Sequence, residues 1–270
     1  MIALTLQEFQ QLYDYIKKNF GINLAGKEHL VLGRLQKTLA DLGMESFAEY
    51  YRYLTHDPTG EAVTGLINKI TTNHTFFLRE NEHFLFLRDH VLPELSVSLK
   101  ERDIRSWSAG CSSGEEPYTI AMILSDFFGP EASLWDKRIL ATDISERVLQ
   151  TAADGVYLNE AIEKVPAHWR LQYFKPYDRE HSIVADRIRK EVIYRRFNLM
   201  NEIFPFKKRF HIIFCRNVMI YFDQETKANL VNHFYDCLES GGYLFIGHSE
   251  SINKQETKLH CLKPAVYRKE

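Results

Sequence analysis

A turn of small residues followed by two glutamates is the part of this chain best suited to hold a ligand. Residues 104–109 are expected to form a short strand, residues 110–114 a tight turn, and residues from Glu115 onward a helix. Pro117 supports a helix start here, because a helix tolerates proline in its first turn. A strand, a glycine turn and a helix in this order let the backbone approach a ligand at the carboxyl end of a sheet strand.

The charge at this turn indicates the kind of ligand. Glu115 and Glu116 would repel a pyrophosphate at a helix N-terminus, which otherwise attracts anions. Gly110 and Gly114 also lack the spacing of a dinucleotide-binding turn. We therefore predict a cationic or neutral ligand with hydroxyl groups. S-adenosylmethionine, a sulfonium that carries an amino acid and a ribose, fits this description.

Two further predicted strands end in polar side chains that could face the same ligand. Asp143 follows strand 138–142, and its carboxylate could accept hydrogen bonds from both ribose hydroxyls or, alternatively, cap the next helix. Asn198 ends strand 192–197, where asparagine is ordinarily a turn residue. Near a cofactor, its amide could instead contact the edge of an adenine.

An apolar run at residues 212–215 is typical of a central parallel strand. Arg216 and Asn217 follow at its carboxyl end, where open α/β sheets bind ligands. We expect Asn217 and, a few residues later, Tyr221 to serve function, although Tyr221 could pack in the core. Arg216 is expected to pair with a surface acid.

Residues 71–80 combine polar and aromatic side chains ahead of the sheet. Asn73, Thr75 and Arg79 flank an aromatic pair and could place hydrogen-bonding groups over a cofactor. The composition fits an interdomain linker equally well. In that case Arg79 and Glu80 would form an exposed ion pair of little energetic value.

Composition is typical of a globular protein. The chain has 270 residues, 45% of them hydrophobic, and a formal net charge of -2. This balance argues against nucleic-acid binding, which usually needs a strongly basic face. The sequence shows no signal peptide and no apolar run near the ~20 residues of a membrane span. Its four cysteines form no Cys-x-x-Cys pair. We expect a cytoplasmic protein with no membrane insertion, nucleic-acid partner or bound metal.

Residues 1–70 are expected to form an all-helical domain. Thr5 with Glu8, and Ser46 with Glu49, have the spacing of capping boxes before two of its helices.

The remainder of the chain has a different pattern. Residues 71–99 are expected to be a linker segment and a helix, and residues 100–270 alternate strands with helices. Such alternation predicts an α/β domain with a mostly parallel, Rossmann-like sheet. Residues 155–191 interrupt it and are expected to be a small antiparallel β insertion. Residues 261–268 are expected to be one closing strand.

Taken together, these segments resemble the chemotaxis receptor (protein-glutamate O-) methyltransferases of bacteria, over nearly the whole chain. The motifs that carry the resemblance are residues 108–118, 141–144, 215–222 and 247–251. The resemblance implies an S-adenosylmethionine-dependent methyltransferase fold, with S-adenosylhomocysteine as product. It implies that glutamates on the cytoplasmic helices of methyl-accepting chemotaxis receptors become methyl esters, as in sensory adaptation.

The resemblance also implies where the site lies. With Gly110 of the turn, the cofactor contacts are expected at Asn73, Thr75, Arg79, Glu115, Asp143, Asn198, Leu199, Asn217 and Val218. Arg79 and Tyr221 are expected beside the reacting methyl, with Arg79 orienting the incoming carboxylate or holding that of the cofactor. Receptor recognition is assigned to residues 1–70, and a receptor tail peptide is a candidate ligand of the insertion.

Two features depart from the family pattern. Leu78 separates the aromatic pair from Arg79, and the helix at 27–42 offers only Lys27, Arg34 and Lys37 as a basic face. Charge attraction to acidic receptor helices is therefore expected to be weaker.

The proposed chemistry needs no general base, because a glutamate with a pKa of ~4.3 is already ionised at neutral pH. Two other functions remain open: methyl transfer to the carboxyl group of a small molecule, and a non-catalytic S-adenosylmethionine sensor.

Overall fold

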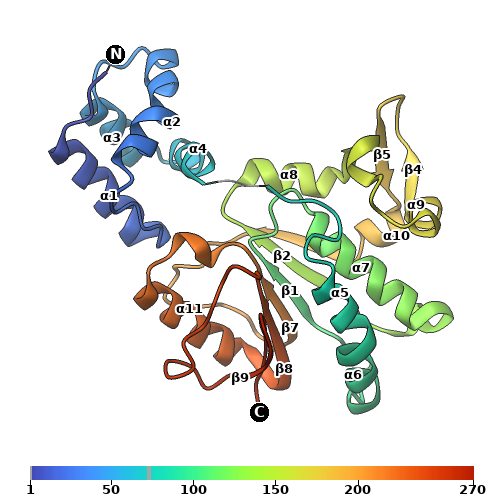
Figure 1. Ribbon diagram of the computed structural model, residues 1–270. Helices are drawn as coiled ribbons and strands as arrows, with labels where there is room; N and C mark the ends of the chain where they lie inside the picture. Colours follow the sequence, from blue (N-terminus) through green and yellow to red (C-terminus); the bar gives the residue numbers. More distant parts are fainter. Residues whose placement is uncertain (1, 72–73) are drawn as a thin grey trace. The chain divides into compact units, whose positions relative to one another are not determined.

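The computed structural model describes residues 2–71 and 74–270. The chain divides into two compact units (Figure 1). One consists of Met1–His74 with Tyr221–Thr226, and the other of Thr75–Ile220 with Lys227–Glu270. Within the described parts of the chain, no helix is long and apolar enough to cross a membrane.

The first unit is helical, as predicted. Its helices are α1 (Leu6–Phe20), α2 (Glu28–Asp41), α3 (Phe47–His56) and α4 (Glu61–Ile70). Thr5 begins α1 with the complete capping box, because Glu8 and Thr5 each accept the other's backbone N–H. Only half of the second box forms. Ser46 accepts the N–H of Glu49, whereas the Glu49 carboxylate accepts the N–H of Glu45.

A short segment from late in the sequence completes this unit. Tyr221–Thr226 lies next to the end of α1, where the N–H of Asn23 donates to the Tyr221 carbonyl at 2.7 Å. Lys17 and Asp223 form an ion pair at 2.8 Å. The sequence did not predict that this late segment would pack with the helical unit.

The second unit is built on a seven-stranded sheet with the order β6-β2-β1-β7-β8-β10-β9. The strands are β1 (Ser106–Ala109), β2 (Ile139–Asp143), β6 (Val192–Arg196), β7 (Phe210–Cys215), β8 (Leu238–Ile246), β9 (His260–Lys263) and β10 (Val266–Arg268). All run parallel except β10, which is antiparallel to both neighbours.

The prediction of one closing strand at residues 261–268 is wrong, because the chain forms the β9–β10 hairpin there. Pro264 lacks a backbone N–H, and Ala265 has a left-handed φ of 65°. Both features favour a turn over a continued strand.

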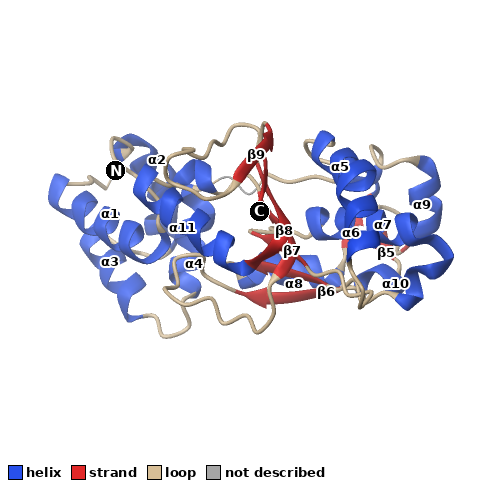
Figure 2. Cartoon of the chain, turned by 90° about the horizontal axis from the view of Figure 1, so that it is seen from below, coloured by secondary structure: helices blue, strands red, loops and turns tan. Residues whose placement is uncertain are grey.

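Helices cover both faces of the sheet (Figure 2). In that view α11 (Gln224–Cys237) lies on one side, and α5 (Glu82–Phe86), α6 (Leu92–Ser98) and α7 (Glu115–Phe128) lie on the other. Consecutive residues of β1 point to these two sides. The Trp107 ring packs against Phe234 of α11, with ring centroids 5.3 Å apart, whereas Ser108 donates a hydrogen bond to Glu116 of α7. The helix predicted before the sheet contains a π-helical turn, Leu87–Val91, between α5 and α6.

The predicted insertion is a three-stranded antiparallel sheet with the order β3-β5-β4. It follows α8 (Glu146–Asp154), and its elements are β3 (Val156–Leu158), α9 (Ala167–Tyr173), β4 (Phe174–Pro176), β5 (His181–Val184) and α10 (Asp186–Arg189). Trp169 and Tyr173 of α9 both donate hydrogen bonds to Asp126, which fastens the insertion to α7.

Candidate active site

The carboxyl ends of β1 and β7 mark the point where the chain changes direction across the sheet. From β1 the chain continues to β2 and β6 on one side, and then returns to β7 and β8 on the other. In open α/β sheets, such a switch point is where ligands bind. The predicted polar segments at 110–118, 143, 198 and 216–218 all follow strands that end at this edge.

The two glycines of the turn after β1 have no room for a Cβ atom. Gly110 has a φ of 86°, and an added Cβ would lie 2.4 Å from Cγ2 of Val218. Gly114 has a φ of 97°, and its Cβ would lie 2.8 Å from that of Ala152. The structure therefore brings together Gly110 and Val218, two of the predicted cofactor residues.

Asp143 connects the tip of β2 to the glycine turn. Its carboxylate accepts the N–H of Ser112 at 2.9 Å and that of Ser145 at 3.0 Å. Ser145, and not Asp143, is the N-cap residue of α8, so the simple helix-cap alternative is wrong. Burial raises the pKa of Asp143, and the backbone hydrogen bonds oppose this shift.

Glu115 begins α7 and is only 7% exposed. The hydroxyl of Ser113 donates to its carboxylate at 2.8 Å, and burial raises its pKa. A buried carboxylate beside a glycine turn disfavours a phosphate ligand, as the sequence indicated.

Asn198 follows β6 close to Asp143, because the N–H of Phe197 donates to the Asp143 carbonyl at 3.0 Å. The Asn198 side chain accepts the N–H of Met200 at 3.0 Å, which is the turn role that the sequence left open. Leu199 is half-buried in the same turn.

Arg216 is buried, so the prediction of a surface ion pair is wrong. Its side chain is 2% exposed and lies 3.2 Å from Glu80 and 3.2 Å from Glu116, whose side chains are 16% and 14% exposed. It also donates to the carbonyl of Arg79. Arg216 thereby fastens the segment before the sheet to the N-terminus of α7.

Asn217 follows Arg216 and also contacts Glu80. Its backbone is left-handed, with a φ of 60°. Its side chain donates to Glu80 at 3.1 Å, and its backbone N–H donates to Glu250 at 3.0 Å. Glu250 also accepts the N–H groups of Gly247 and Ile220. Burial raises the pKa of Glu250, which these hydrogen bonds oppose.

Glu80, Glu116 and Glu250 were not assigned to the site from the sequence. The sequence feature that could have identified these three glutamates is their position inside or beside the motif segments. Their partners are more distant: Arg216 is 136 positions from Glu80 and 100 positions from Glu116.

The segment that contains Thr75 and Arg79 is anchored through an aromatic ring. Phe77 is 2% exposed, and its ring packs edge-on against Tyr157 and Phe174 of the insertion, with centroids 4.9 and 5.4 Å apart. Thr75 and Arg79 are half-buried. Glu80 pairs with Arg216 inside the unit, so it is not half of an exposed pair. Asn73 lies outside the described residues.

Tyr221 is half-buried and follows β7 in a short 3-10 turn, Met219–Tyr221. By its contacts it belongs to the helical unit. Its predicted place beside the reacting methyl stays a prediction.

Comparison with known proteins accounts for both units. The model of the CheR methyltransferase all-alpha domain matches residues 7–71, and that of the CheR methyltransferase SAM-binding domain matches residues 73–268. This chain belongs to the CheR methyltransferase family. Tyr221–Thr226 lies within the SAM-binding match, although its contacts place it with the all-alpha domain.

Relatives of similar length support this membership. The chemotaxis protein methyltransferase of Borreliella burgdorferi is 42% identical over 99% of this chain and 96% of its own length. That of Escherichia coli is 34% identical over 98% and 92%. Chemotaxis protein methyltransferase 2 of Pseudomonas aeruginosa is 36% identical over 97% and 93%. The solved glycopeptide N-methyltransferase MtfA, complexed with sinefungin, covers 59% of this chain and 48% of its own at 12% identity. The TM-score of this match is 0.32.

Proposed function

We propose that this protein transfers the methyl group of S-adenosylmethionine to glutamate side chains on the cytoplasmic helices of chemotaxis receptors. The observation that carries the proposal is the match to both CheR domains, together with full-length relatives that are chemotaxis protein methyltransferases. The products would be S-adenosylhomocysteine and a glutamate methyl ester.

The residues at the sheet edge fit this cofactor. Gly110 keeps the turn free of a side chain, and Asp143 places a carboxylate acceptor at the tip of β2. The proposed contacts are Asn73, Thr75, Arg79, Gly110, Glu115, Asp143, Asn198, Leu199, Asn217 and Val218. When bound, S-adenosylmethionine supplies a methyl group activated by its sulfonium.

The residues of the chain then have to position the acceptor. Arg79 is proposed to orient the glutamate carboxylate or to hold that of the cofactor, and Tyr221 to shape the space around the methyl. The hydrogen bond from Arg216 to the Arg79 carbonyl supports a fixed backbone at this position. A glutamate with a pKa of ~4.3 needs no base at neutral pH, and positioning alone can supply effective molarities of ~10⁵ M or more.

Receptor recognition is proposed for the helical unit. On α2, Arg34 already donates to the carbonyls of Lys69 and Thr71, whereas Lys37 is exposed. Lys37→Glu should slow receptor methylation and leave cofactor affinity unchanged, because a charge at an interface rim mainly affects association. Lys254→Glu, at an exposed position of the sheet unit, is the matched control. The insertion is a proposed docking place for a receptor tail peptide.

One experiment tests the proposal as a whole. The purified protein is incubated with methyl-labelled S-adenosylmethionine and membranes that contain chemotaxis receptors. Label should appear on the receptor band, and mild alkali should release it as volatile methanol, since esters hydrolyse and methylamines do not. Alkali-stable label would reject glutamate as the acceptor. Label on small molecules alone, or cofactor binding without transfer, would favour the other two functions.

A further inference from the structure

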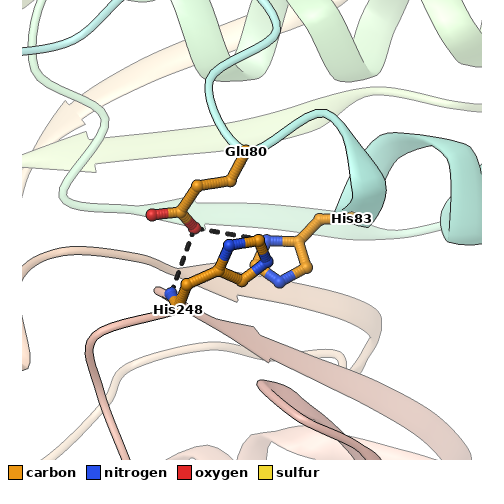
Figure 3. A group of neighbouring side chains, drawn as sticks. All are labelled: Glu80, His83 and His248. Carbon is orange, nitrogen blue, oxygen red and sulfur yellow. Dashed lines mark hydrogen bonds and ion pairs between the residues drawn. The ribbon is translucent and has the colours of Figure 1, made fainter.

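Three side chains that could hold a metal ion lie together at the carboxyl edge of the sheet. They are Glu80, His83 and His248, and Figure 3 shows the Glu80 carboxylate facing both the His83 ring and the backbone nitrogen of His248. One possible ligand atom from each residue lies within 4.8 Å of the others. Among the residues that the structure describes, this is the one such group.

His83 is the observation that points to a ligand. It is 0% exposed, and neither of its ring nitrogens has a hydrogen-bond partner among the described residues. Buried polar atoms are nearly always satisfied, and leaving one unsatisfied is costly. Its Nδ1 lies 3.5 Å from Oε2 of Glu80, and its ring lies edge-on to that of His248, with centroids 4.5 Å apart.

The spacing suits a transition metal. Two ligands at 2.0–2.1 Å from one tetrahedral ion are about 3.4 Å apart, which matches the separation of His83 and Glu80. The third ligand has to approach by up to about 1.4 Å to reach the same tetrahedral spacing, since the three ligand atoms lie within 4.8 Å of one another. His248 can do this because its side chain is exposed and follows the end of β8.

Charges of both signs surround this group, and the positive ones predominate at His83. Arg216 and Lys263 both act on His83 and oppose a cation there. Glu80 and Glu116 together offset the guanidinium of Arg216. Asn217 donates to Oε1 of Glu80 at 3.1 Å. Oε2 faces Nδ1 of His83 at 3.5 Å. The same oxygen accepts hydrogen bonds from the Arg216 guanidinium and the backbone N–H of His248, both at 3.2 Å, so a bound ion would have to share it with these donors.

We propose that Glu80, His83 and His248 form a binding site for a divalent transition metal, with two imidazoles and one carboxylate as ligands. This donor set suits Zn²⁺, Co²⁺ or Ni²⁺ and does not suit Mg²⁺ or Ca²⁺, which prefer oxygen ligands. A bound ion would connect the segment after Arg79 to the end of β8.

The test measures metal binding directly and does not depend on methyl transfer, so its failure is distinct from that of the proposed function. Full-length protein is stripped with a chelator and titrated with Zn²⁺ by calorimetry. His248→Ala is the main variant, because the side chain is exposed and its loss should not affect folding. His260→Ala, which removes another exposed histidine of the same unit, is the matched control. Glu80→Gln tests the carboxylate independently.

Wild type and His260→Ala should bind one equivalent of Zn²⁺ with the same affinity. His248→Ala and Glu80→Gln should bind it at least about tenfold more weakly, since even indirect partners of a metal site can have effects of this size. Visible absorption bands of bound Co²⁺ should be lost in parallel. Equal affinity of wild type and His248→Ala would place the ion at other histidines and overturn the proposal, as would the absence of stoichiometric binding to wild type.

Discussion

Replacing Arg216 by methionine tests whether the buried ion pairs hold the active-site segments together. The change removes the contacts to Glu80 and Glu116 at 3.2 Å and the hydrogen bond to the Arg79 carbonyl. It also removes the stacking of the guanidinium on Phe84, at 5.1 Å from the ring centroid. Methionine keeps much of the volume and flexibility of the side chain, so a large cavity is not the main effect.

The expected loss follows from the carboxylates that remain. Removing one partner of a buried pair costs ~3–5 kcal/mol, because the other charge stays buried and unpaired. Here the two acids are 16% and 14% exposed and keep hydrogen bonds from Asn217 and Ser108. We therefore expect the lower end, a loss of about 3 kcal/mol in the free energy of unfolding at neutral pH.

Urea unfolding monitored by tryptophan fluorescence measures this loss of stability in the sheet unit, where Arg216 lies. All 3 tryptophans, Trp107, Trp135 and Trp169, belong to the sheet unit. Arg138→Met is the matched control, because Arg138 pairs with Asp136 while 60% exposed. An exposed pair of this kind contributes ~0–1 kcal/mol.

A double mutant separates the unpaired charge from the lost contacts. Glu116→Gln combined with Arg216→Met removes one of the carboxylates that Arg216→Met leaves buried and unpaired. The double mutant should therefore be more stable than Arg216→Met alone. Arg216→Met within about 1 kcal/mol of wild type, the range of an exposed pair, would refute the reasoning. A double mutant that is no more stable than the single mutant would show that Glu116 is not the charge that matters.

Four further outcomes are expected. Asp143→Ala should weaken S-adenosylhomocysteine binding in calorimetry by ~1–3 kcal/mol through the loss of a buried hydrogen-bond acceptor, and unchanged affinity would remove Asp143 from the site. Gly110→Ala should lower the urea midpoint, because its φ is 86° and its Cβ would meet Val218 at 2.4 Å; adding Val218→Ala should restore part of the loss, and no recovery would contradict the steric reason. Arg79→Ala and Arg79→Lys should both lower turnover about tenfold or more at saturating cofactor, since ~1.4 kcal/mol of lost alignment suffices; wild-type turnover in both variants would exclude Arg79 from orienting the substrate. Burial raises the folded-state pKa of Glu116 above 4.5, and loss of the Arg216 guanidinium should raise it further. The folded state of the variant then binds the Glu116 proton more tightly than the unfolded state does. Its free energy of unfolding therefore falls as the pH rises above 4.5. The deficit of Arg216→Met in urea unfolding should therefore be smaller near about pH 5 than near about pH 8, and a deficit independent of pH would contradict this.

The sequence by itself determined the local elements of the fold. Thr5 and Glu8 specify the start of α1 because the capping box joins residues three positions apart. The glycine turn before α7 is equally local, since Gly110 and Gly114 need left-handed φ values that other residues avoid. The alternation of apolar runs with helices predicted the parallel sheet, and the stretch 155–191 that interrupts this alternation predicted the insertion.

Only the tertiary structure decided which polar side chains meet. Arg216 was expected at the surface, because nothing near it in the sequence shows that Glu80 and Glu116 bury its charge. Likewise, His248 reaches Glu80 across 168 positions, a separation at which chain spacing carries no information on contact. The pairing partners of an ionic side chain depend on how strands and helices pack, whereas caps and turns depend on neighbours within a few residues. For this reason the sequence could point to the edge of the sheet where the proposed site lies, whereas only packing shows which charged side chains meet there.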